Sequence, residues 1–205
     1  GIEPLQGQVV LSNFKPFQSS FETEDIERVL KTDDPWFRPV DIKTGPDGHI
    51  YIADMYEQRI DHSSHYAGRV DKSSGRIYKL KGQSEKPATP FDYSRLADAD
   101  LIKLLDHPGK WHRQMAVKLL GDRFSPGAAS ASKTGAERRS AAVKQLEAEL
   151  AKATGQSALE RLWALNACGG LTDPMTLRLL THEEPFVRAW TIRIVCDPGT
   201  TSPEV

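Results

Sequence analysis

The chain has 205 residues, of which 39% are hydrophobic, and this is enough apolar material for the core of one or two domains. Its formal net charge of -1 gives no overall attraction to nucleic acid or to an anionic membrane, so neither is expected as a partner. No apolar run approaches the roughly 18 residues of a membrane helix, and we expect no membrane span in this chain.

The first 82 residues have the pattern of β-structure. Short runs rich in β-branched and aromatic residues alternate with turn-forming residues, which favours strands. The predicted strands cover residues 8–14, 25–30, 38–44, 49–55 and 75–80. Their spacing of about ten residues is typical of a propeller or a sandwich.

The sequence GPDG at residues 45–48 predicts a hairpin between two of these strands. Asp47 and Gly48 tolerate the positive φ that a tight β-turn requires. Such a hairpin would bring the start of 38–44 and the end of 49–55 to one edge of the sheet. We therefore expect a polar cluster at this edge, formed by Trp36, Phe37, Arg38, Asp41, Asp54, Tyr56, Glu57, Arg59, His62 and His65.

These residues also have structural interpretations. Trp36 and Phe37 are explained well as packing residues, and an ion pair would explain Arg38 as readily as ligand binding would. His62 and His65 have a spacing of three residues, but two histidines alone are a weak signal for a metal. We expect a polar loop network or a ligand contact at the histidines and no metal site.

From residue 94 onward the apolar residues repeat with a helical period. Residues 83–93 contain two prolines and few apolar groups, and this predicts a linker. Helices are predicted over 98–107, 110–123, 138–153 and 157–170, with a small-residue insertion at 125–135 and a tail at 198–205.

The helical half contains an internal repeat, because residues 106–122 align with residues 181–197 at an offset of 75. His107 then matches His182, and Arg113 matches Arg188. The offset is close to twice the roughly 40-residue period of HEAT-type helical pairs, which predicts HEAT-like repeats over 94–197 that stack into a solenoid. We expect each arginine to pair with the aspartate that ends its own or the next repeat.

The chain has two cysteines, Cys168 and Cys196, and both are predicted to be buried free thiols. It contains no CxxCH sequence, so c-type haem would have to be bound outside this chain. The chain does not begin with methionine, and we expect it to be a piece of a longer protein.

Several longer segments resemble one family. They are DDPWFRPVDIKTGPDGHIYIADMYEQRIDHSSHYAGRVDKSSGRIYKL, LLDHPGKWHRQMAVKLLGDR, ALERLWALNACGGL and PFVRAWTIRIVCD. Together they resemble the membrane-bound dehydrogenases of planctomycetes and verrucomicrobia, also called PVC-type haem-binding proteins. The resemblance spans about residues 8–197. It implies the C-terminal part of a β-propeller similar to glucose/sorbosone dehydrogenases over 1–82, followed by an α-helical HEAT-like solenoid.

The same resemblance implies a function for the whole protein. It would be a periplasmic or envelope-associated dehydrogenase that acts on sugars or sugar alcohols and passes electrons to a cytochrome c domain of the same full-length chain. In the related sugar dehydrogenases, arginines hold the carboxylates of pyrroloquinoline quinone, which works with calcium. Among Arg38, Arg59, Arg69 and Arg76, we expect Arg38 and Arg59 to take this role.

The remaining edge residues would face the substrate or form loops beside it, namely Asp41, Asp54, Tyr56, His62 and His65. No residue of this chain can be assigned as the catalytic base, and we expect the chain alone to be inactive. The alternative function is a non-catalytic binding module for glycan or protein, in which Arg38 and the histidines would be structural.

Overall fold

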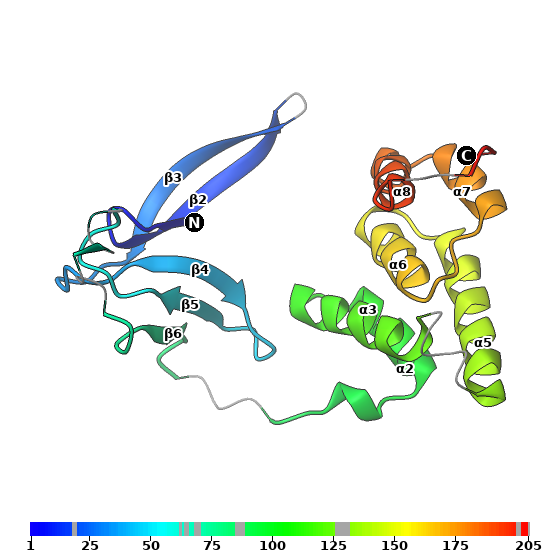
Figure 1. Ribbon diagram of the computed structural model, residues 1–205, viewed down its shortest axis with the longest axis horizontal. Coiled ribbons are helices and arrows are strands. Elements are labelled where there is room, and N and C mark those ends of the chain that lie inside the picture. Colours follow the sequence, from blue (N-terminus) through cyan, green and yellow to red (C-terminus); the bar gives the residue numbers. More distant parts are fainter. Residues whose placement is uncertain are drawn as a thin grey trace. The chain divides into compact units, whose positions relative to one another are not determined.

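A computed structural model describes residues 1–17, 20–61, 63, 66–67, 71–84, 89–125, 132–199 and 202–204. The chain divides into two units, Gly1–Ala88 and Thr89–Val205. In the described residues the first unit contains strands and the second contains helices (Figure 1). We call them the strand unit and the helical unit.

The strand unit consists of two antiparallel sheets of three strands each. The first sheet has the order β1-β2-β3, with β1 at Ile2–Glu3, β2 at Gln8–Phe17 and β3 at Ser20–Leu30. The second has the order β4-β5-β6, with β4 at Pro39–Thr44, β5 at Ile50–Asp54 and β6 at Arg76–Leu80. All five predicted strands are present, and only the short β1 was not predicted.

The core of the strand unit is small. Val9, Phe37 and Ile52 are its buried apolar residues, and the Phe37 ring packs edge-on against Tyr78. The distal parts of β2 and β3 form a long two-stranded hairpin (Figure 1). Apart from Ser12 and Leu30, the described residues of this hairpin beyond Val10 are exposed.

The hairpin predicted from GPDG joins β4 to β5. Gly48 has a φ of 78°, and its amide donates to the carbonyl of Gly45 at 3.1 Å. The register pairs Pro39 with Asp54, so the start of β4 and the end of β5 meet at one edge of the sheet. This part of the prediction is confirmed.

The predicted fold class is wrong. The described strands form two separate three-stranded sheets and no closed propeller, whereas a propeller blade is a four-stranded sheet. The chain is a mixed α/β protein in which the described strands pair only with their neighbours in sequence. A spacing of about ten residues between strands predicts such local pairing, but it carries no information about how sheets close on one another.

The helical unit has six described α-helices. They are α2 at Asp98–Lys103, α3 at Lys110–Phe124, α5 at Lys133–Leu150, α6 at Gly155–Ala167, α7 at Asp173–Leu180 and α8 at Pro185–Cys196. Two short 3-10 segments precede α3, at Tyr93–Arg95 and Leu104–Asp106. Helix α7 was not predicted from the sequence.

These helices surround one core, and they contact one another as successive pairs. In a solenoid each repeat contacts only its neighbours. Here α2 contacts α3, α5 contacts α6 and α7 contacts α8, while α6 of the middle pair also contacts α3 and α8. All six helices contribute buried residues to one cluster (Figure 1). The HEAT-like repeats over 94–197 stay a prediction. Helix α6 is therefore central, and its buried residues even include Glu160 and Arg161.

Two smaller expectations, on the cysteines and on membrane spans, can be compared with the helical unit. Cys168 is a buried free thiol whose pKa burial raises to about 11, but Cys196 is exposed, so the prediction of burial was wrong for Cys196. Asp98 is the first residue of α2 and binds the guanidinium groups of Arg123 and Arg138. None of the described helices is both long and apolar enough to cross a membrane.

The loop before β2 passes close to the segment before β4, and alanine variants of two glycines test this close approach. Gly7 has a φ of 61°, and a Cβ there would lie 2.8 Å from the carbonyl oxygen of Phe37 and 3.1 Å from Nη1 of Arg38. Gly48 has a φ of 78° with nothing within 4 Å. A side chain costs about 1–2 kcal/mol in this backbone region, so both alanine variants should be destabilised.

G7A should lose about 1–3 kcal/mol more than G48A, because only Gly7 also faces a steric conflict. Hydrogen exchange of the strand-unit amides in the full chain would measure both variants. Equal losses would show that the Phe37 carbonyl moves aside easily, and that the two segments are not tightly packed.

Candidate functional site

The predicted edge cluster exists in part, and a buried carboxylate organises it. Asp54 ends β5 with 5% of its surface exposed, and its Oδ1 accepts hydrogen bonds from the backbone amides of Arg38 at 2.8 Å and Tyr56 at 2.9 Å. Asp54 and Arg38 therefore meet through a backbone amide, and no ion pair joins their side chains among the described contacts.

Tyr56 has a backbone conformation that few residues other than glycine adopt, with a φ of 57°. Its ring stacks on Trp36 with a centroid distance of 5.7 Å, and the Arg76 guanidinium lies 4.7 Å from the ring centroid. Its amide donates to Asp54 and closes an Asx turn. The contacts explain Tyr56 and Trp36 as packing residues of the loop after β5.

Other predicted site residues lie elsewhere or are already paired. Asp41 is exposed, and the Lys43 ammonium holds the pKa of its carboxyl below the usual range by a hydrogen bond. Arg59 is exposed and pairs with Asp61. His62 and His65, together with Arg69, lie outside the described residues.

The arrangement of Arg38 and Arg59 does not fit the predicted quinone. The Nη1 and Nη2 groups of Arg38 donate to the carbonyls of Phe37 and Gln58, so only its buried Nε has no partner among the described residues. A quinone carboxylate would need the guanidinium groups to be free and directed together. No group of three or more His, Cys, Asp or Glu in the described part of the chain could hold calcium.

In the helical unit, the internal repeat appears as a repeated turn. Nδ1 of His107 accepts from the Gly109 amide at 3.0 Å, and Nδ1 of His182 accepts from the Glu184 amide at 3.1 Å. Six residues after each histidine, an arginine caps the turn. Nη1 of Arg113 donates to the carbonyls of His107 and Pro108, and Nη1 of Arg188 donates to those of His182 and Glu183.

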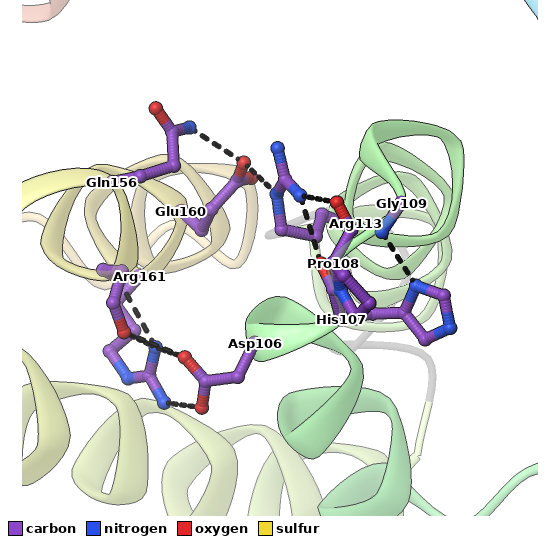
Figure 2. A network of polar contacts seen from close by, with 9 residues as sticks. Asp106, His107, Pro108, Gly109, Arg113, Gln156, Glu160 and Arg161 are labelled. Atoms are coloured by element: carbon purple, nitrogen blue, oxygen red, sulfur yellow. Dashed lines mark hydrogen bonds and ion pairs between the residues drawn. The ribbon is translucent and has the colours of Figure 1, made fainter.

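The partner predicted for these arginines was wrong. Arg113 pairs with Glu160 on α6, whose Oε1 accepts from Nε at 2.8 Å (Figure 2). Asp122 instead binds Lys118. A second pair lies beside it on α6, where Arg161 binds Asp106 and Glu149. The hydrogen bond from Arg161 holds the pKa of Asp106 below its usual range.

A groove of about 600 Å³ lies next to the Arg113–Glu160 pair, between α3, α6 and α8. This volume is within the range of about 300–1,000 Å³ that is common for small-molecule sites. Both polar and aromatic side chains line the groove. They are Lys110, Arg113, Gln114 and Val117 from α3, Gln156, Glu160 and Trp163 from α6, and Trp190 from α8.

Two polar atoms of groove residues are buried without a hydrogen-bond partner in the described structure, Oε2 of Glu160 and Nε1 of Trp163. Glu160 is only 2% exposed, and its other oxygen accepts from Arg113 and from Gln156. Such groups are rare in folded proteins, because an unmet buried donor or acceptor costs about 1–3 kcal/mol. Trp190 adds an aromatic wall and meets Trp163 edge-on at 5.0 Å.

Sequence reasoning did not identify this groove, although one signal for it was present. Lys110, Arg113, Gln114 and Val117 have the spacing of one helix face, as do Gln156, Glu160 and Trp163. A mixed polar and aromatic face on two helices is usually solvated surface. Only the packing of α6 against α3 and α8 shows that these faces meet.

The comparisons with known proteins cover the strand unit only. Residues 5–84 match the family described as "Domain of unknown function (DUF7133)". No curated protein and no solved structure shows significant similarity to the chain. The matched segment contains Asp54 with Trp36, Arg38 and Tyr56, which we call the Asp54 cluster. The groove of the helical unit lies outside the matched segment.

Proposed function

We propose that the chain is a non-catalytic binding module whose helical unit holds a carbohydrate in the groove between α3, α6 and α8. One observation carries the proposal. Glu160 and Trp163 lie one turn apart on α6, and the buried acceptor Oε2 of Glu160 and the buried donor Nε1 of Trp163 have no hydrogen-bond partner in the part of the chain that the structure describes. Sugar hydroxyls can meet both needs, because a hydroxyl group both donates and accepts hydrogen bonds.

The rest of the groove also favours a sugar. A pyranose ring has an apolar C–H face bordered by hydroxyl groups, and it suits aromatic walls that lie beside hydrogen-bonding side chains. Trp163 and Trp190 supply aromatic surface, while the exposed Gln114 and Gln156 supply amides. Gln156 is bound to Glu160 by a hydrogen bond of 2.8 Å, and its rotation would open a path to the carboxylate.

Titration calorimetry of the full chain with a panel of neutral and acidic methyl glycosides tests the proposal. We expect binding by at least one glycoside, and W163F should bind it about three- to tenfold more weakly, because this variant keeps the ring but removes the donor. W111F is the matched control, since Trp111 lies on α3 outside the groove, and its affinity should equal that of the unaltered chain.

Two results would count against the carbohydrate. No heat of binding with any glycoside would remove the proposal, and so would an affinity that W163F leaves unchanged. In both cases a buried water would explain the two unpartnered atoms better. Sugar oxidation, which the resemblance implies, remains a prediction without support from the described residues.

A further inference from the structure

The charges around the groove do not balance. Glu160 is the one carboxylate among the described residues that line it, and it is already paired with Arg113. Lys110 also lines it and has no ion pair among the described residues. Arg193, whose guanidinium lies 5.0 Å from the ring centroid of Trp190, likewise has no carboxylate partner there. The groove is therefore positively charged at neutral pH.

Hydrogen-bond donors at the same place lack acceptors. Lys110 is the first residue of α3, whose first turn contains no acidic residue and whose N-cap, Gly109, offers no side-chain acceptor. The helix dipole adds partial positive charge at this end. Nη2 of Arg113 also makes no hydrogen bond among the described residues, and Figure 2 shows this nitrogen without a dashed line. These donors and charges match an anionic group of a ligand.

We infer that the sugar carries a carboxylate, so that the groove selects a hexuronate over the neutral hexose. The inference rests on the proposed carbohydrate binding and adds the chemical class of the ligand. Lys110 and Nη2 of Arg113 bind the carboxylate, while Glu160 and Trp163 bind hydroxyls of the ring. The carboxylate does not meet an uncompensated charge at Glu160, because Arg113 neutralises that side chain.

The test compares methyl β-glucuronoside with methyl β-glucoside, which differ only in a carboxylate against a hydroxymethyl group. Calorimetry with the full chain should show the glucuronoside binding about three- to tenfold tighter, as charge-assisted hydrogen bonds allow. Raising the salt concentration should reduce this preference, because ions screen partly exposed charges. Acetate alone should not displace the glucuronoside.

Two lysine variants distinguish an effect of the charge in the groove from an effect of the overall charge of the chain. K110Q should lower the affinity for the glucuronoside more than for the glucoside. K118Q removes the same charge from α3 but changes a lysine that is paired with Asp122 outside the groove, and it should keep the preference.

The possible outcomes distinguish the two proposals. Equal affinities for the two glycosides, or a preference that survives K110Q, would overturn the hexuronate and leave carbohydrate binding intact. Displacement by acetate at similar concentration would show a general anion site and overturn the hexuronate as well. If neither glycoside bound, the hexuronate proposal would be wrong. If no glycoside of the whole panel bound, the proposal of carbohydrate binding would be wrong too.

Discussion

Replacing Arg113 with methionine should lower the free energy of unfolding of the helical unit by about 3–5 kcal/mol. Glu160 is 2% exposed, and Arg113 supplies the only cation that pairs with it among the described residues. Without that cation the carboxylate keeps a single hydrogen bond, from Gln156. A buried charge without a partner is far more costly than a lost surface ion pair.

The internal repeat provides the matched control. Arg188 caps an equivalent turn through the carbonyls of His182 and Glu183, but no carboxylate pairs with it in the described structure. R188M therefore removes the same two carbonyl bonds without stranding a buried charge, and it should cost only about 1–3 kcal/mol. The difference between R113M and R188M isolates the contribution of Glu160.

Urea denaturation followed by circular dichroism would measure both variants and the double variant R113M/E160M. The double variant should recover much of the stability lost in R113M, because two apolar side chains replace the buried pair. If R113M and R188M were equally destabilised, Glu160 would have to be uncharged in the folded chain, and the groove would need a different electrostatic description.

Features set by neighbouring residues were predictable from the sequence. The GPDG turn fixed the hairpin between β4 and β5, and the alternating runs located five strands. The repeated spacing of His107 with Arg113 and of His182 with Arg188 pointed to one recurring turn. Each of these features depends on contacts within a few residues, which local sequence describes well.

Features that join distant segments were not predictable. Arg113 finds its carboxylate 47 residues away on α6, so no spacing in the sequence distinguished Glu160 from Asp122. The propeller failed for the same reason, since strand patterns do not state how sheets assemble. The groove also forms only where α3, α6 and α8 pack together, and these helices do not follow one another directly in the sequence.

The Asp54 cluster shows how a residue can be located correctly while its role stays open. The sequence placed Asp54 beside Arg38, and the structure agrees, but the contact is a hydrogen bond between carboxylate and backbone amide. A carboxylate next to an arginine in a sequence suggests an ion pair. The sequence does not show that two nearby backbone amides need an acceptor.

D54A should therefore destabilise the strand unit by about 2–4 kcal/mol, because the amides of Arg38 and Tyr56 would both lose their acceptor. D54N keeps an oxygen that can accept both bonds and should cost less. The exposed Asp41 on β4 is the matched control, and D41A should change stability by less than about 0.5 kcal/mol.

Hydrogen exchange in the full chain reads these variants amide by amide. In D54A the amides of Arg38 and Tyr56 should exchange much faster than in D41A, because both lose their acceptor. Unchanged exchange at both amides would mean that Asp54 is not needed for the loop after β5. Its Oδ2, which is buried and has no partner in the described structure, would then be better explained as a ligand contact.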